Sequence, residues 1–231
     1  MPTADPPALL ELSGVSRSYA DRHALLPTDL TVASGQCVAV LGANGSGKST
    51  LLRIAAGRDT PSTGQVSYAG RRMTADDPVV RTEIAVVGDL VSAYPDLTVR
   101  EHLLLVAVAH GAGRSAGPLA DRALRECRLD GHAAALPPSL SSGQQQALQL
   151  AAMLVRPRRL MVLDEPEQRL DPAARRWLAG LLRAEKAAGA ALLLATHHAE
   201  LAAAVADYVI VLSDGAVTTA GRPGDALAEL P

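Results

Sequence analysis

Short apolar runs recur along the chain, and each ends at a glycine or at polar residues. Runs of about four to eight such residues are typical of strands buried on both faces of a parallel sheet. Five runs predict strands, at residues 36–42, 83–88, 160–166, 191–198 and 208–215. The last of these is expected to close the set. The pattern therefore predicts an α/β fold with a mainly parallel sheet.

Helical patterns separate the predicted strands. After the first strand, apolar residues at helical spacing in 51–55 predict a helix that ends near Gly57. A second helix is expected to begin after Thr98, because Thr98 and Glu101 occupy the two positions of a capping box. A strand, a glycine-rich stretch and a helix thus follow one another in the first part of the chain.

The segment from residue 89 to residue 157 carries helical signals only, interrupted by breaks rich in Gly and Pro. It lies between the second and third predicted strands, so we expect a helical subdomain inserted into a core made of residues 1–88 and 158–231. The chain has 231 residues, a length suited to one such domain.

The composition excludes some functions. Hydrophobic residues make up 48% of the chain, enough for a large buried core, although Phe is absent and Leu, Val and Ala must fill it. The net charge is −2 and the 22 basic residues are scattered, whereas a nucleic-acid-binding surface normally carries a basic face. No nucleic-acid partner is therefore expected.

Targeting and redox signals point to a soluble cytoplasmic protein. The first residues lack the basic start and apolar core of a secretion signal. The apolar run at residues 103–109 is much shorter than the roughly 18–20 residues needed to span a bilayer. Cys37 and Cys127 lack the spacing of metal ligands and are expected to be reduced core thiols.

The first candidate site is the stretch GANGSGKST, which fits the pattern G-x-x-x-x-G-K-[ST]. Glycine permits the dihedrals with which several backbone N–H groups point at a phosphate chain, and the following helix adds its positive dipole end. Lys48 is expected to reach the β- and γ-phosphates, and Ser49 to ligate Mg²⁺. The residues expected to hold the nucleotide here are Gly42, Ala43, Asn44, Gly45, Ser46, Gly47, Lys48, Ser49 and Thr50.

The sequence around this stretch argues against two alternatives. A glycine-rich turn with a chance lysine is disfavoured by the strand and the helix that flank it. A dinucleotide-binding G-x-G-x-x-G is excluded, because Thr50 stands where the third glycine should fall.

Carboxylates and a histidine follow two later strands. Asp164 and Glu165 stand at a strand's carboxyl end, where ligands of doubly wound sheets bind. Asp164 is suited to hold Mg²⁺ through water, and Glu165 to polarise a water aligned with the γ-phosphate. His197 could hydrogen-bond the γ-phosphate and fix that water. A surface turn and a polar strand cap are the alternatives, and the adjacent His198 is a possible substitute for His197.

The stretch LSSGQQQ at residues 140–146 precedes the LDEP strand. With the phosphate loop upstream and the pair Thr196–His197 downstream, the chain resembles an ATP-binding cassette (ABC) ATPase over roughly residues 10–221. The resemblance implies a P-loop NTPase (RecA-like) core with a mainly parallel sheet, an N-terminal antiparallel β portion and an inserted helical subdomain. It also implies hydrolysis of ATP with Mg²⁺.

In this family two subunits close head-to-tail around two ATP molecules. The resemblance implies that the signature of one subunit, Ser141, Ser142 and Gly143 followed by Gln144, caps the γ-phosphate held by the other's phosphate loop. A serine hydroxyl and a helix N-terminus together make a second anion site.

Further roles are implied residue by residue. Tyr19 matches the aromatic that stacks on adenine, although an ordinary strand-end tyrosine is the alternative. Asp171 matches the aspartate that signals across the dimer, Glu165 the catalytic base and His197 the switch histidine.

Three departures from the family pattern stand out. Asp89 occupies the place of a glutamine after the second strand, where it can still ligate Mg²⁺ or its water. Ser142 replaces a glycine of the signature, and residues 167–169 replace small or polar ones. The lysine, the base and the switch histidine are retained, so we expect a competent site in which these departures can slow turnover.

The resemblance further implies a membrane permease on another chain and a position on the inner face of the cell membrane. Residues 94–104 resemble the segment of exporter-type cassettes that receives a helix of the membrane subunit. The short end after Gly221 leaves no room for the regulatory domain of many importers, which favours export. A soluble cassette ATPase acting on DNA or ribosomes, and a module that binds ATP without turnover, stay open.

Overall fold

The computed structural model describes residues 8–74, 77–88 and 93–228. The strands are β1 (Ala8–Tyr19), β2 (Arg22–Ala33), β3 (Cys37–Leu41), β4 (Thr63–Tyr68), β5 (Arg71–Arg72), β6 (Ile84–Val87), β7 (Leu160–Asp164), β8 (Ala191–Ala195), β9 (Tyr208–Ser213) and β10 (Ala216–Gly221). The α-helices are α1 (Lys48–Ala55), α2 (Pro78–Glu83), α3 (Val99–Ala109), α4 (Ala116–Glu126), α5 (Ser142–Leu154), α6 (Pro172–Ala187), α7 (Ala199–Val205) and α8 (Pro223–Ala226). Three 3₁₀ turns join them, η1 (Gly113–Ser115), η2 (Asp130–His132) and η3 (Pro137–Ser139).

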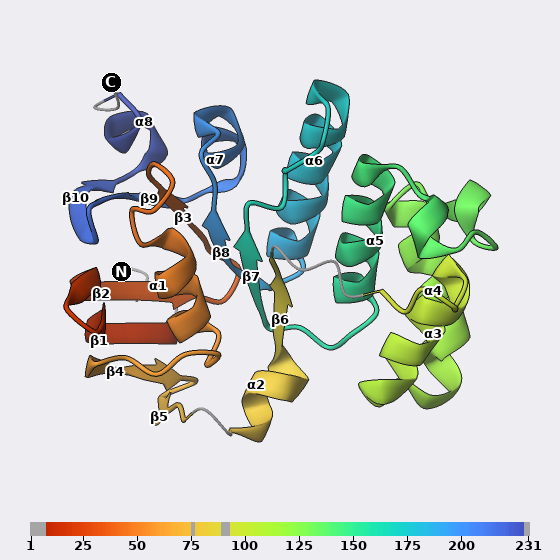
Figure 1. Ribbon diagram of the computed structural model, residues 1–231, viewed down its shortest axis with the longest axis horizontal. Helices are drawn as coiled ribbons and strands as arrows, with labels where there is room; N and C mark the ends of the chain where they lie inside the picture. Colours follow the sequence, from red (N-terminus) through yellow and green to blue (C-terminus); the bar gives the residue numbers. More distant parts are fainter. Residues whose placement is uncertain (1–7, 75–76, 89–92, 229–231) are drawn as a thin grey trace, which may run out of the picture.

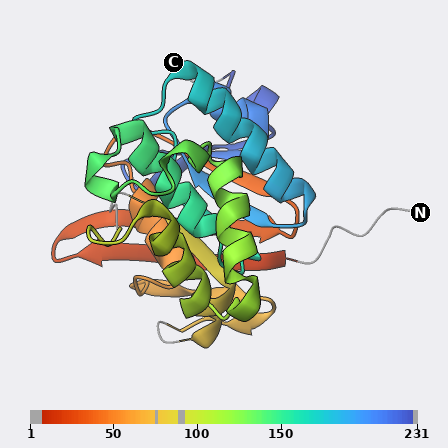
Figure 2. The same ribbon diagram turned by 90° about the vertical axis from the view of Figure 1, so that its right-hand side faces the viewer.

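Two sheets form the framework. A four-stranded antiparallel sheet has the order β2-β1-β4-β5, and a six-stranded sheet has the order β10-β9-β3-β8-β7-β6. Figure 1 shows the antiparallel sheet on one side of the molecule and α3, α4 and α5 on the other, with β8, β7 and β6 of the larger sheet between them. In Figure 2, α3 and α4 face the viewer. This architecture confirms the predicted P-loop NTPase class.

Five strands of the larger sheet, β6, β7, β8, β3 and β9, run parallel. Their buried apolar runs are the ones that the sequence predicts. β8 lies between β3 and β7, and Ala195 is level with both Val40 and Asp164. The loops after β3, β7 and β8 therefore leave the same edge of the sheet side by side.

The expectation that the strand at 208–215 closes the set was wrong. β10 follows it as an antiparallel edge strand, through a tight turn at Asp214 and Gly215 with φ of +48° and +80°. Asp-Gly is a strong signal for such a hairpin. The strand itself was missed because none of its residues is buried and it carries no apolar run.

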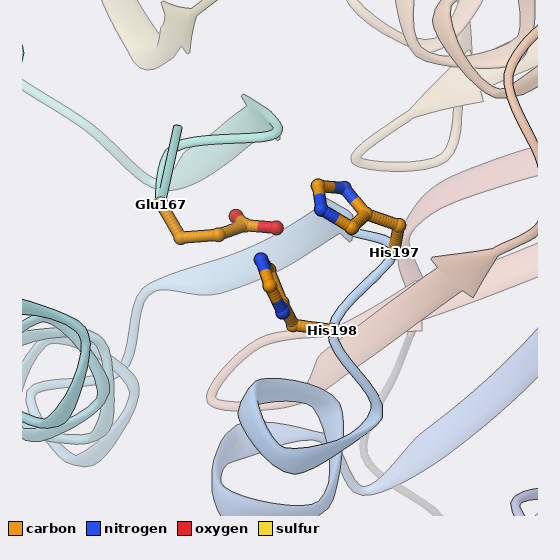
Figure 3. A group of neighbouring side chains, drawn as sticks. All are labelled: Glu167, His197 and His198. Carbon is orange, nitrogen blue, oxygen red and sulfur yellow. The ribbon is translucent and has the colours of Figure 1, made fainter. Parts of the chain in front are cut away.

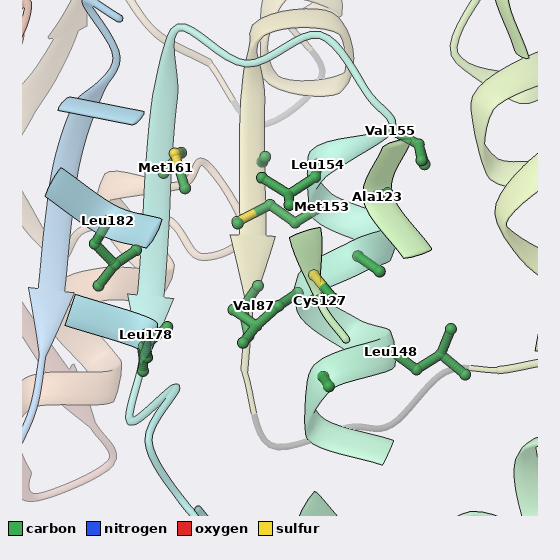
Figure 4. Close-up of a cluster of buried hydrophobic side chains, with 14 of the residues drawn as sticks. Val87, Ala123, Cys127, Leu148, Met153, Leu154, Val155, Met161, Leu178 and Leu182 are labelled. Carbon is green, nitrogen blue, oxygen red and sulfur yellow. The ribbon is translucent and has the colours of Figure 1, made fainter. Parts of the chain in front are cut away.

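One buried cluster joins the larger sheet to the helical segment. Val87 on β6 and Met161 on β7 belong to the same cluster as Met153 on α5, Leu178 on α6 and Cys127 (Figure 4). Between β6 and β7, the described residues form α3, α4, α5 and 3₁₀ turns. Whether residues 89–157 act as one subdomain stays a prediction.

The structure confirms the predicted start of α3 after Thr98. The Thr98 hydroxyl accepts from the backbone N–H of Glu101 at 3.3 Å, and the Glu101 carboxylate accepts from that of Thr98 at 2.8 Å. This reciprocal pair is the predicted capping box. Among the described residues, no helix combines the length and apolar character that a membrane span requires.

Both cysteines are buried thiols without a disulfide. Burial raises the pKa of Cys37 to about 12 and raises that of Cys127 further. Neither thiol is therefore ionised at neutral pH, in keeping with the prediction of inert core cysteines.

Candidate functional site

The loop between β3 and α1 has a backbone that only glycine can adopt at two positions. Gly42 has φ of +148° and Gly47 φ of +109°. A Cβ at Gly42 would lie 2.3 Å from the carbonyl oxygen of Leu212, and one at Gly47 would lie 2.6 Å from that of Ala24. Both obstacles are backbone atoms, so the loop is held closely by β9 and β2.

Lys48, the first residue of α1, is 4% exposed. Its Nζ donates to the carbonyl oxygens of Gly42 at 2.8 Å and Ala43 at 3.1 Å, and lies 3.5 Å from Oε1 of Glu165. Three oxygens thus surround an ammonium group that has three protons to donate. The sheet topology brings Lys48 and Glu165 together although they are far apart in the sequence.

A cavity of ≈ 520 Å³ opens beside this loop. Its volume is within the range of about 300–1,000 Å³ that is usual for small-molecule sites. It joins the phosphate loop to the residues after β7 and to the end of β1. The predicted residues that line it are Tyr19, Asn44, Gly45, Gly47, Lys48, Ser49, Thr50, Asp164 and Glu165. Gly42, Ala43 and Ser46 complete the turn of the loop.

Glu165 stands at a strained point directly after β7, with φ of +47°. Non-glycine residues in this region cluster at functional sites. Its Oε2 accepts a hydrogen bond from Nε2 of Gln168 at 2.9 Å and lies 3.5 Å from Nδ1 of His197. Burial by itself raises the pKa of Glu165, but Gln168, Lys48 and His197 outweigh it and the net pKa lies below the ordinary value. The carboxylate is therefore charged at neutral pH.

Sequence reasoning missed several residues of this cavity, among them Arg22, Arg53 and Gln168. Gln168 was treated only as a departure from the family pattern, yet its N–H also donates to the carbonyl of Glu165 at 3.0 Å. Arg53 lies four residues after Ser49 on α1, and this helical spacing was an available signal. Nothing in the sequence near Arg22 indicated that it lines the cavity, because its position there depends on the pairing of β1 with β2.

Tyr19 lies at the rim of the cavity and is 41% exposed. Its hydroxyl donates to Asp59, and the guanidinium carbon of Arg17 lies 4.5 Å from the centroid of its ring. Arg17 and Asp59 form an ion pair at 2.8 Å. The ring is thus fixed in orientation by two polar neighbours, one of them a cation over its face.

The predicted metal ligands are partly brought together. Ser49 and Asp164 line the same cavity. A hydroxyl and a carboxylate are the oxygen ligands that Mg²⁺ prefers, so this pair fits the ion. Asp89, the third predicted ligand, lies outside the described residues.

The signature residues lie elsewhere. Ser141, Ser142, Gly143 and Gln144 line a second hollow of ≈ 400 Å³, together with Asp171. No described residue lines both this hollow and the cavity at Lys48. Within one chain, the structure therefore does not bring the signature to the phosphate loop.

Local hydrogen bonds hold the signature in place. The Ser141 hydroxyl accepts from the N–H of Gln144 at 3.3 Å, and the Gln144 side chain accepts from the N–H of Ser141 at 2.9 Å. Asp171 caps α6, accepting from the N–H of Ala174 at 2.7 Å. Ser142 is exposed at the first turn of α5. Two helix N-termini, those of α5 and α6, thus meet at this hollow.

His197 follows β8 beside Glu165, with a side chain that is 48% exposed. Its ring centroid lies 4.1 Å from that of His198. The structure places it next to the predicted base, although it does not line the cavity at Lys48.

Comparisons with known proteins agree with this geometry. A family model described as "ABC transporter" matches residues 25–168. The "Nod factor export ATP-binding protein I" of Rhizobium meliloti (strain 1021) is 34% identical over 224 residues, which are 96% of this chain and 67% of that protein.

Solved structures extend the likeness to the whole fold. A dimeric bacterial ABC transporter cassette has a TM-score of 0.85 and 25% identity, over 93% of this chain and 98% of the other. A post-hydrolysis dimer of an ATP-binding cassette bound to ADP and Pi has a TM-score of 0.85 and 26% identity, with the same coverage. Since the family model covers more than half of the chain, the protein belongs to the ABC transporter family, as an ATP-binding and ATP-hydrolysing subunit.

Proposed function

We propose that two cassettes close around two ATP molecules and that hydrolysis at their interface drives a membrane exporter on a separate chain. The observation that carries this proposal is the separation of two half-sites within one chain. Lys48 and Glu165 line one cavity, whereas Ser141 lines another. A head-to-tail arrangement of two chains would let each signature complete the other's phosphate site.

The cavity at Lys48 has the chemistry that a nucleoside triphosphate needs. Its backbone N–H groups and the N-terminus of α1 face the phosphates, and Lys48 adds a fixed positive charge. Tyr19 at the rim stacks on the adenine in this arrangement. Mg²⁺, held by Ser49 and Asp164, supplies neutralisation of phosphate charge when it is bound.

Hydrolysis requires a water aligned with the γ-phosphate. In our proposal the charged carboxylate of Glu165 accepts a hydrogen bond from this water and polarises it. The hydrogen bond from Gln168 and the strained backbone of Glu165 hold the carboxylate in one orientation. His197, 3.5 Å from Glu165, contacts the γ-phosphate. Asp171 relays closure across the dimer.

A membrane partner is supported by the surface around α3. Tyr94, Leu105 and Val108 are 59%, 42% and 58% exposed, on the segment predicted to receive a helix of the membrane subunit and on the helix that it leads into. Exposed apolar groups of this kind mark interaction surfaces. The name of the rhizobial relative specifies export, which favours that direction for this chain.

Phosphate release tests the catalytic half of the proposal. Glu165→Gln should lower the rate by about 100-fold or more, because the base is lost, while ATP binding persists and ATP-dependent dimers accumulate. Glu11→Gln, at an exposed carboxylate on β1, is the matched control and should keep the wild-type rate. Equal and negligible rates for wild type and Glu165→Gln would favour a module that binds ATP without turnover.

Purification in detergent tests the transport half. The tagged chain should bring with it a protein with several membrane spans. Val108→Glu should abolish this association, whereas Val217→Glu, which also charges an exposed apolar position but on β10, should not. Recovery of ribosomes or DNA in place of a membrane protein would contradict the proposal.

A further inference from the structure

Three side chains face one another beside the catalytic cavity. Glu167 lies in the turn after β7, and His197 and His198 follow β8, the neighbouring strand. One ligand atom from each of the three lies within 4.8 Å of the others. Figure 3 shows the carboxylate of Glu167 directed at the two imidazole rings.

The carboxylate of Glu167 lacks a partner on one side. The residue is 1% exposed, and one oxygen accepts a hydrogen bond from the Thr196 hydroxyl. The other oxygen, Oε2, is buried and has no hydrogen-bond partner among the described residues. Buried carboxylate oxygens are normally hydrogen-bonded or bound to a cation. Since the carboxylate that carries this oxygen faces two imidazoles, a cation bound among the three side chains would satisfy it.

The histidines are suited to supply the remaining ligands. The two residues are adjacent in the chain, and their ring centroids lie 4.1 Å apart. Imidazole nitrogens are common ligands of transition metals. Arg175 opposes a cation, because its Nη1 lies 3.1 Å from Nδ1 of His198, so the guanidinium must move when a metal binds.

We propose that Glu167, His197 and His198 bind a divalent transition metal of the zinc type, and that this metal inhibits ATP hydrolysis. Two imidazole nitrogens and one carboxylate oxygen are a known donor set for four-coordinate Zn²⁺ with one open position. Bonds of about 2.0–2.1 Å place such ligands about 3.3 Å apart, so each pair needs to close by about 1.5 Å at most. Mg²⁺ prefers oxygen ligands alone, which separates this site from the one at Ser49 and Asp164.

The inhibition follows from His197 and rests on the proposed function. A ring that ligates a metal beside Glu167 is withdrawn from the γ-phosphate of ATP. The metal also displaces any proton on Glu167 and adds positive charge near Glu165, which weakens that carboxylate as a base. Metal binding itself needs neither ATP nor turnover, so the two parts of the inference can fail separately.

Binding is tested on the nucleotide-free chain with its affinity tag removed and Co²⁺ as the probe. The visible absorption of four-coordinate Co²⁺ should appear at one ion per chain and disappear on addition of Zn²⁺. Glu167→Gln and His198→Gln should each weaken binding at least 10-fold. His110→Gln, which removes an imidazole at the C-cap of α3, should leave it unchanged. Arg175→Gln should tighten it several-fold.

Unchanged Co²⁺ binding in both Glu167→Gln and His198→Gln would overturn the site. Thermal unfolding in the presence of Zn²⁺ provides a second readout that does not depend on coordination geometry, since a metal that binds only the folded chain raises Tm. At the same Zn²⁺ concentration this stabilisation should be smaller in both variants than in wild type. A wild-type Tm unaffected by Zn²⁺ would contradict the proposal.

Inhibition is tested by phosphate release at saturating Mg²⁺–ATP with free Zn²⁺ buffered in the micromolar range. Each protein is compared with itself, with and without Zn²⁺. Wild type should lose activity and recover it with a zinc-selective chelator, and His198→Gln should show the same rate in both conditions. If Co²⁺ binds at these residues but Zn²⁺ leaves the rate unchanged, the metal site stands and its regulatory role is wrong.

Discussion

The N-termini of α1 and α5 are both expected to meet phosphate, but they are built differently. α1 begins after Gly47, which has a left-handed backbone and provides no side-chain cap. The first residues of α1 line the same cavity as Glu165. α5 begins after Ser141, whose hydroxyl is engaged in a complete capping box with Gln144.

The difference shows which end depends on a second molecule. Backbone of the same chain encloses the start of α1, so the anion site predicted there needs no partner to form. The start of α5 is exposed, and the side chains of Ser141 and Gln144 pair with backbone N–H groups there. Damage at α1 should therefore abolish nucleotide binding, and damage at α5 should leave binding intact and impair turnover.

The largest effect is expected from Gly47→Ala. A Cβ there would lie 2.6 Å from a backbone oxygen, and at φ of +109° the substitution strains the loop as well. We expect filter binding to show loss of measurable ATP affinity, and thermal unfolding to show destabilisation of about 2 kcal/mol or more. Gly45→Ala is the control: it also has positive φ but meets open space, so it should cost only about 1 kcal/mol. Wild-type affinity in Gly47→Ala would refute the enclosed loop.

Mixing two inactive variants tests whether the half-sites meet across a dimer. Lys48→Ala and Ser141→Arg should each be inactive alone. Random mixing gives half hybrid dimers, each with one intact site, so phosphate release should return to about a quarter of the wild-type rate if the sites act independently. A mixture of two different Lys48 variants should recover nothing. Dimers that form without any recovery would show that Ser141 does not complete the site of Lys48.

Two matched capping boxes separate stability from catalysis. Thr98→Ala and Ser141→Ala each remove the cap of one helix, α3 or α5. Both should lower the free energy of unfolding by about 1 kcal/mol. Only Ser141→Ala should also lower phosphate release, by about 10-fold or more, because a hydrogen bond to a charged group contributes about 1.5–3 kcal/mol. Equal rates for the two variants would assign Ser141 to helix capping alone.

The smallest effect concerns Glu167, in the segment that links the two half-sites. Burial raises the pKa of its carboxyl group. Between the unfolded and the folded pKa the native state holds more protons, so stability falls as pH rises through this window. Glu167→Gln should therefore raise the free energy of unfolding by about 1 kcal/mol at neutral pH, and by less near pH 4, as urea titrations without added metal would show. An increase in the free energy of unfolding that is the same at both pH values would contradict a raised pKa for Glu167.

The sequence predicted those parts of the molecule that local patterns determine. The five parallel strands, the glycine-rich turn between β3 and α1, and the capping box at Thr98 all have signals within a few residues, and the structure confirms them. Asp171 was identified only through the family resemblance, although Asp followed by Pro is also a signature of a helix start, which is its observed role.

What the sequence did not reveal depends on contacts between distant segments. The burial of Glu167 requires β8 to lie beside β7, and the approach of Arg22 to the cavity requires the pairing of β1 with β2. Gln168 is only three residues from Glu165, but the hydrogen bond between their side chains depends on the left-handed backbone at Glu165. The residue types around Glu165 do not predict that backbone conformation. The edge strand β10 was missed because none of its residues is buried, so it carries no apolar run.

Trp177 is the chain's single tryptophan, and its position has a practical consequence. Its indole N–H donates to the carbonyl of Glu126 at 2.9 Å, and the ring lines the same hollow as Ser141 and Asp171. A second cassette that docks at this hollow would displace water from around the indole. Because the chain has no other tryptophan, intrinsic emission would then report the closing and reopening of the pair in real time, without any attached dye.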